Sequence, residues 1–318
     1  MSVLPITIDE YTMLHDAYTG GGGFDSGEYL FQHSREDMAD FMVRKKMARY
    51  SNFVKVIIKA LTNPIFKKTI VRDFAENEML KKFVEDVDGQ KTPLNAFMKK
   101  ATKWARLYGR VFIVMDNYAE EEQVINRADA LDMRRFPYLY IVCPNQITDY
   151  ETDRWGRFVK LSYKLRVKQS KGDMTGIGDM EEWTWTETGW TCKSGNKAEK
   201  VREGLHGLGM LPVVTLSSVD EDTNDPLPVP DMLHIAKGNR DVFNRDSEKR
   251  EILRNQCFPV LVYPATRQSA TELKQTDEEG KPLGLTMGTG NMLVVDAAAG
   301  ALPNFIAPPL EPVQTLQQ

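Results

Sequence analysis

The chain has 318 residues, of which 42% are hydrophobic and 27% are charged. This composition is ordinary for a folded protein and excludes a largely disordered chain, and the length suggests about two domains. Its 41 basic and 45 acidic residues leave a formal net charge of −4. That balance argues against a free-standing nucleic-acid-binding domain, because such domains are usually basic overall.

The three cysteines, Cys143, Cys192 and Cys257, are far apart in the sequence and form no CxxC pair. We therefore expect free thiols in a reducing compartment. The N-terminal residues lack the apolar core of a signal peptide, and no apolar run approaches the roughly 20 residues of a membrane span. The sequence predicts a protein made in the cytoplasm, with no membrane partner.

Residues 1–34 are predicted to be an extended or loosely structured arm. Gly20 to Gly23 form a four-glycine run. Neither the Lys-Ser/Thr of a P-loop nor the strand and helix of a dinucleotide-binding turn surrounds it, so a flexible turn is the favoured interpretation. A long amphipathic helix is then predicted from Ser34, with Asp37 three residues on, to Leu61, and Asn63-Pro64 ends it.

The central part of the chain is predicted to be mostly β-structure. Residues 65–74 suggest a strand, and Thr92-Pro93 begins a helix that Gly109 ends. Alternation around Thr188-Gly189 predicts a hairpin, and its tryptophans are more typical of a sheet cover than of a base or sugar site. Further strands are predicted at residues 111–115, 137–144, 157–167, 212–216, 257–263 and 291–296.

A long polar helix is predicted from Asp231 to Asn255, after an acidic, proline-containing linker at residues 220–230. It carries six basic and five acidic residues and cannot bury a wide face. Pairs at i,i+4, Asp241 with Arg245 and Asp246 with Arg250, are expected to stabilise it by a few tenths of a kcal/mol each. Either it packs against copies of itself through polar contacts, or it is an ordinary solvated surface helix.

The sequence offers no recognisable catalytic chemistry. None of the four histidines has a partner at the spacing of a metal site or a catalytic triad. G-x-S-x-G, H-E-x-x-H and G-K-[ST] are all absent from the sequence. We therefore predict a protein that is not an enzyme, and we assign no catalytic, cofactor-binding or metal-binding residue and no cofactor.

Several segments occur in an order that is informative as a whole. They are Arg49-Tyr-Ser-Asn-Phe53 with Asn63-Pro-Ile-Phe66, Asp86-Val-Asp-Gly89, Leu107-Tyr-Gly-Arg-Val-Phe-Ile-Val-Met-Asp116, Phe136-Pro-Tyr138 to Ile147-Thr-Asp-Tyr150, Leu211-Pro-Val-Val214, and Ile235-Ala-Lys-Gly-Asn239 through Glu251-Ile-Leu-Arg-Asn-Gln256 to Phe258-Pro-Val-Leu-Val262. Together, over nearly the whole chain, they resemble the portal proteins of tailed bacteriophages.

The resemblance implies an α+β fold in portal-like parts. These are an N-terminal arm (1–34), a mixed α/β wing domain (35–225), a stem helix (226–256), a small α/β clip (257–302) and the start of a second stem or tunnel segment (303–318). Portals continue past Leu310-Glu-Pro-Val313 into a long helix, a tunnel loop and a crown, whereas this sequence stops at Gln318. We expect the chain to be truncated or to lack those parts.

The resemblance also implies function and partners. The chain would form a homo-oligomeric ring, expected to be a dodecamer, at one capsid vertex of the virion, after assembly in the host cytoplasm. The ring would be the channel for double-stranded DNA during packaging and ejection, and would dock the terminase large subunit, the head–tail adaptor and the major capsid protein. ATP hydrolysis would belong to the terminase motor.

The site residues follow from the same resemblance. Because portal stem helices line the channel, Lys237, Arg240, Arg245 and Lys249 are candidates to face DNA or to pair with a neighbouring subunit. Phe258, Val260 and Val262 are candidates for the clip interface.

Three other hypotheses for the function stay open. The first is another virion ring or connector protein, although adaptors are usually shorter. The second is a DNA-processing enzyme with an unrecognised site, which metal-dependent activity on DNA would reveal. The third is a monomeric nucleic-acid-binding module, for which a steep salt dependence of DNA affinity would speak.

Overall fold

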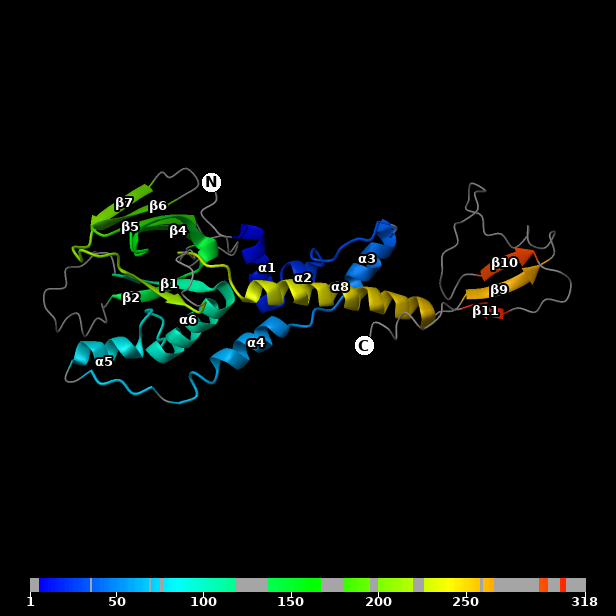
Figure 1. Cartoon of the computed structure of the whole chain (residues 1–318), viewed down its shortest axis with the longest axis horizontal. Helices are drawn as coiled ribbons and strands as arrows, with labels where there is room; N and C mark the ends of the chain where they lie inside the picture. Colours follow the sequence, from blue (N-terminus) through cyan, green and yellow to red (C-terminus); the bar gives the residue numbers. More distant parts are fainter. Residues whose placement is uncertain are drawn as a thin grey trace, which may run out of the picture. The chain divides into compact units, whose positions relative to one another are not determined.

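The computed structural model is α+β (Figure 1). It describes residues 6–34, 36–68, 70–74, 77–117, 137–166, 180–194, 200–219, 226–257, 260–265, 292–296 and 304–306. The chain forms two units: Met1–Gly21 with Asn52–Asn239, and Gly22–Ser51 with Arg240–Gln318. These units are discontinuous in sequence, whereas the predicted arm, wing, stem and clip are consecutive segments.

The helices of the first unit are α1 (Ile8–Thr19), α4 (Phe53–Thr62), α5 (Glu78–Glu85) and α6 (Leu94–Tyr108). Helix α1 begins with a capping box, in which Thr7 and Glu10 bond each other's backbone N–H groups, and Gly20 ends it at a φ of 82°. The prediction of an extended arm over residues 1–34 is therefore wrong for α1. Helix α6 was predicted, and Gly109 ends it as expected.

Two antiparallel sheets complete the first unit. One has the order β2-β1-β8, formed by β1 (Arg110–Asp116), β2 (Tyr138–Val142) and β8 (Val213–Ser217). The other runs in sequence order through β3 (Ile147–Thr152), β4 (Phe158–Arg166), β5 (Met180–Thr186), β6 (Gly189–Ser194) and β7 (Lys200–Leu205), with the 3-10 helix η1 (Pro144–Gln146) before β3.

The apolar core of the first unit lies on both sides of β1. Phe112 and Val114 pack with Leu161, Tyr163 and Trp185 of the five-stranded sheet. On the other side, Ile113 packs with Phe97 and Ala101 of α6 and with Val87. The two packed sides of β1 confirm the strand predicted at residues 111–115, of which Val111 to Val114 are buried and Met115 is exposed.

The tryptophans of the β5–β6 hairpin cover the sheet, as predicted. Trp183 and Trp185 stack with ring centroids 6.0 Å apart, and Trp190 lies 5.4 Å from Trp183. Trp185 is buried and donates from Nε1 to the Tyr163 hydroxyl over 2.8 Å. Their indole rings are thus engaged with the core and with one another.

The second unit contains α2 (Gly23–Ser26), α3 (Met38–Met47) and, from Arg240 on, most of α8 (Met232–Cys257). It also contains a three-stranded sheet of β9 (Val260–Ala265), β10 (Met292–Asp296) and β11 (Asn304–Ile306). Strand β9 is central, parallel to β10 and antiparallel to β11. Helix α8 confirms the predicted long polar helix.

Two predictions near residue 50 are wrong. The single helix from Ser34 to Leu61 is two helices, because the backbone leaves the helical region at Ala48 and Asn52 caps α4 by accepting from the Lys55 N–H. Helix α3 begins after Asp37 rather than at Ser34. Among the described residues from 65 to 74 there is no strand, and the bond from the Phe66 N–H to the Asn63 carbonyl forms a turn instead.

Helix α5 was not predicted from the sequence at all. Residues 220–225 of the predicted linker lie outside the described part of the chain.

Cys143 and Cys192 are free thiols, as expected. Among the helices of the described residues, none combines the length and the apolar character needed to cross a membrane.

Candidate functional site: the polar faces of helix α8

Helix α8 carries the four candidate channel cations and is 26 residues long. Its buried positions form a narrow stripe that includes three polar residues, Asn239, Asn244 and Ser247, beside apolar ones. In the second unit the apolar anchor is Phe243, which packs edge-on against Phe24 with ring centroids 5.4 Å apart. The helix is therefore held by hydrogen bonds as much as by apolar packing.

Two of the candidate cations make contacts inside the chain. In the first unit, Lys237 Nζ lies 2.7 Å from Glu10 Oε1, and this hydrogen bond is the main reason that the pKa of Glu10 is lowered. In the second unit, the Arg240 guanidinium lies 5.1 Å from the centroid of the Phe31 ring, a cation–π contact. Neither side chain is fully available to a partner molecule.

The other two candidates face outward in the second unit. Arg245 is exposed and Lys249 is half-buried, and neither forms an ion pair or hydrogen bond with any residue of the described part of the chain. Asp241 and Glu248 are exposed at helical spacing from Arg245. The outward face of α8 thus carries charges of both signs.

The predicted i,i+4 ion pairs are not formed. Asp241 with Arg245 and Asp246 with Arg250 have no ion pair within 4.0 Å, although all four side chains belong to the described residues. The physical reason is that an exposed pair gains little over solvation of each charge by water. Stabilisation of α8 has to come from its inner face.

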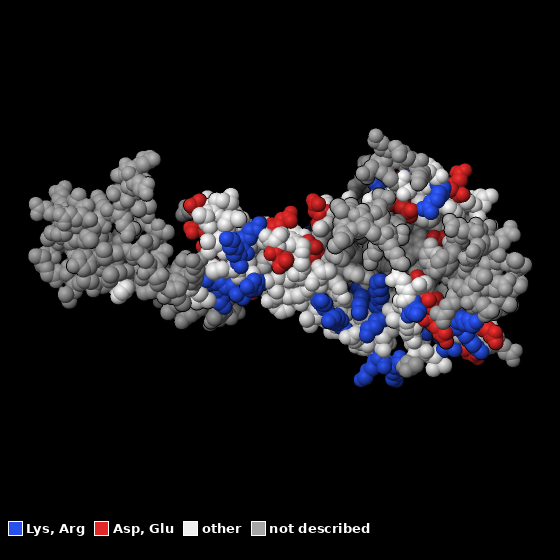
Figure 2. All heavy atoms as spheres, turned by 180° about the vertical axis from the view of Figure 1, so that it is seen from behind, with Lys and Arg blue, Asp and Glu red and all other residues white. Residues whose placement is uncertain are grey.

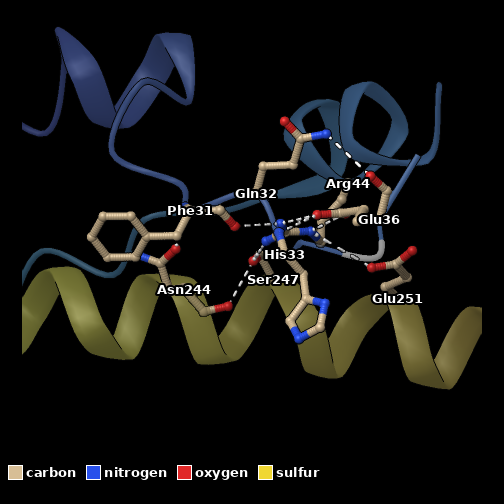
Figure 3. A network of polar contacts seen from close by, with 8 residues as sticks. All are labelled: Phe31, Gln32, His33, Glu36, Arg44, Asn244, Ser247 and Glu251. Carbon is tan, nitrogen blue, oxygen red and sulfur yellow. Dashed lines mark hydrogen bonds and ion pairs between the residues drawn. The ribbon is translucent and has the colours of Figure 1, made fainter. Parts of the chain in front are cut away.

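The inner face of α8 packs against a buried arginine of helix α3 (Figure 3). The Arg44 side chain, from α3, is only 2% exposed. Its Nε and Nη2 donate to the two carboxylate oxygens of Glu36 over 2.7 and 2.6 Å, which is a bidentate pair. Nη2 also donates to the Phe31 carbonyl over 2.6 Å, and Nη1 donates to Ser247 Oγ over 2.9 Å.

Further contacts complete the network of Figure 3. Glu251 Oε2 lies 3.6 Å from Arg44 Nε. The Asn244 amide accepts from the Phe31 N–H over 2.8 Å and donates to the Tyr29 carbonyl over 3.0 Å. Residues 29–31, α3 and α8 are therefore joined by one set of polar contacts, which we call the Arg44 network.

The charges of the Arg44 network stabilise each other. Hydrogen bonds from Arg44 lower the pKa of Glu36, against the opposing effect of its burial, and the same contact raises the pKa of Arg44. Both groups are charged at neutral pH. A buried charge is costly unless it is paired and hydrogen-bonded, so the position of α3 against α8 is specified by its partners.

Helix α3 is oriented with its arginine inward and its apolar residues outward. Met38, Met42 and Val43 are 58%, 47% and 37% exposed, while Arg44 is buried. The amphipathic helix predicted for this segment implied the reverse, because methionines at helical spacing normally mark the buried face. The Arg44 network was missed for this reason: no local pattern marks Arg44, and its partners Ser247 and Glu251 lie on α8.

The candidate clip residues are only partly located. Val260 and Val262 have their backbone in β9, the central strand of the three-stranded sheet. Phe258 lies outside the described residues. Among the described residues there is also no group of three His, Cys, Asp or Glu side chains that could hold a metal ion.

The comparisons with known proteins give no family. No family model matches the chain, and no curated protein matches it.

Proposed function

We propose that the chain is the subunit of a portal-type ring, a protein without enzymatic activity that forms the DNA channel at one capsid vertex of a tailed bacteriophage. In this proposal the ring conducts double-stranded DNA during packaging and ejection. It docks the terminase large subunit, the head–tail adaptor and the capsid, and it belongs to the virion after assembly in the host cytoplasm.

The observation that carries the proposal is the orientation of α3 and α8 in the second unit. The Arg44 network holds the polar sides of the two helices together, so the apolar residues Met38 and Met42 and the cation Arg245 face outward. Exposed apolar rows on a soluble protein indicate a surface that a partner covers. A second copy of the chain supplies that partner in a ring.

Charges of both signs on α8 suit the same arrangement. Asp241, Arg245 and Glu248 have no ion-pair partner among the described residues of the subunit. In a ring of helices each charge can meet an opposite charge of the next copy, and cations left over can face DNA. Because both signs are present, few phosphates would be neutralised, which allows DNA to slide.

The experiment that tests the proposal is the particle mass of the purified chain, measured by mass photometry over a range of protein and salt concentrations. A closed ring predicts one dominant species at about twelve times the subunit mass of 36.2 kDa. Particles of the subunit mass at every concentration would contradict the proposal.

A further inference from the structure

Helices α4 and α6 of the first unit, together with residues 63–68 after α4, have a strongly one-sided charge distribution. Residues 53–68 and 94–109 contain eight basic residues and no acidic one: Lys55, Lys59, Lys67, Lys68, Lys99, Lys100, Lys103 and Arg106. The whole chain has a net charge of −4, so with these eight charges set aside the remaining residues carry −12. The cluster is a local feature and not a consequence of overall composition.

The basic residues lie in one part of the first unit. Helices α4 and α6 pack against each other, and Figure 2 shows Lys and Arg side chains gathered over this part of the first unit, with few acidic side chains between them. None of the eight forms an ion pair with a described residue. We call these eight residues the α4–α6 basic surface.

The spacing of the charges works against the stability of the subunit. Lys55 and Lys59 are four residues apart on α4, and Lys99 and Lys103 are four apart on α6, with Arg106 three further on. Like charges at i,i+4 destabilise a helix by a few tenths of a kcal/mol. Since none of the eight forms an ion pair with an acidic group of the described residues, an external polyanion would complement the cluster.

We propose that the α4–α6 basic surface binds the phosphate backbone of duplex DNA without reading its sequence. This inference takes the identity of the polyanion from the proposed function, but it assigns the DNA contact to residues of the first unit other than the candidate cations of helix α8. The row from Lys99 to Arg106 is about 10 Å long on a helix. Over that length duplex DNA carries about six negative charges, which is enough to engage every cation of the row.

The residue types favour DNA over an acidic protein surface. Seven of the eight cations are lysines, which are depleted in protein–protein interfaces and common in backbone contacts to DNA. On α6 they also favour a duplex over a single strand, which binds by stacking bases on free aromatic rings. Trp104 is the tryptophan of α6, and its ring is already stacked with His15 and Tyr108.

The test measures binding of the full chain to a labelled random-sequence duplex by fluorescence anisotropy between 25 and 200 mM NaCl. One variant combines Lys99→Gln, Lys103→Gln and Arg106→Gln. The control combines Lys164→Gln, Arg166→Gln and Lys193→Gln, which removes the same charge from exposed positions of the five-stranded sheet. Melting temperatures check that both variants fold.

The inference predicts that wild type binds DNA more weakly as the salt concentration rises. In the α6 variant the negative slope of log affinity against log salt concentration should be shallower by about 2 to 3. The control should keep the wild-type slope. Absence of binding at 25 mM NaCl, or equal losses in variant and control, would overturn the inference. So would a variant that binds DNA normally but self-associates less, because the surface would then meet an acidic protein surface.

Particle masses of the same samples separate this inference from the proposed function. If the chain forms rings but these residues do not contribute to duplex binding, only the proposed role of the α4–α6 basic surface is overturned. If the subunits stay monomeric and the α6 variant still shows the predicted loss of salt-dependent DNA binding, only the proposed ring is overturned.

Discussion

Arg44 donates a hydrogen bond from Nη1 to Ser247 Oγ over 2.9 Å, although 203 positions separate the two residues in the sequence. Ser247 in turn donates to the Asn244 carbonyl within α8. This contact joins α3 to α8 and decides which side of each helix faces outward.

Replacing Arg44 by alanine should destabilise the protein by about 3–5 kcal/mol, because Glu36 would be left as a buried carboxylate without its partner. Chemical denaturation followed by circular dichroism measures this loss. Arg49→Ala is the matched control, since Arg49 is exposed in the same segment and should change the free energy of unfolding by less than about 0.5 kcal/mol. Equal effects of the two substitutions would show that the Arg44 network contributes nothing.

The contribution of Glu36 should depend on pH. Its pKa is lowered in the folded protein by the Arg44 hydrogen bonds, so the folded state binds the Glu36 proton less readily than the unfolded state does. The stabilisation is therefore present at neutral pH. It is lost as pH falls below the ordinary value of 4.5 and through the lowered pKa.

Glu36→Gln isolates this effect, because it removes the titrating group and leaves the other carboxylates. The free-energy advantage of wild type over Glu36→Gln, measured by urea denaturation, should be largest near pH 7 and should shrink steadily below pH 4.5. A difference that stays constant from pH 7 to pH 3 would contradict the ion pair.

Gly204 should be intolerant of a side chain. It lies opposite Trp190 in the β6–β7 ladder, and a Cβ there would come within 2.9 Å of the indole ring. We expect Gly204→Ala to destabilise the protein by about 1–3 kcal/mol through overpacking, measured as a loss of unfolding free energy. Gly238→Ala on α8 is the contrast. Apart from the backbone of its own helix, no described residue lies within 4 Å of its Cβ position, so the substitution should stabilise the protein by about 0.5–1 kcal/mol.

The exposed apolar row of α3 should be needed for assembly. Combining Met38→Lys with Met42→Lys places charges on that row without touching the Arg44 network, so the subunit should fold normally and the ring should not form. Sedimentation velocity measures the loss of the large species. Met210→Lys, at a site 66% exposed in the first unit, is the control and should assemble like wild type. Assembly of the double variant would exclude this row from the subunit interface.

Much of the fold could be predicted because its signals are local. The periodicity of α6 and the glycine after it marked that helix, and the charge pattern of residues 231–255 marked α8. The capping box at Thr7 and Glu10 was equally local, and it would have located α1 had the glycine run that follows not suggested an arm.

The Arg44 network could not be predicted, because burial of Arg44 depends on residues of a distant helix. The sequence of α3 alone favours burying its methionines, and a set of tertiary hydrogen bonds reverses that preference. The candidate cations of α8 were located correctly on the helix. Their availability was not predictable, because the partners of Lys237 and Arg240 are Glu10 and Phe31, which lie more than two hundred positions away.

The most direct test of the ring is electron microscopy of the purified full chain, with class averages viewed down the particle axis. The proposal predicts closed rings of about twelve subunits around a central opening wide enough for duplex DNA. Single subunits only, or closed particles without an opening, would contradict it.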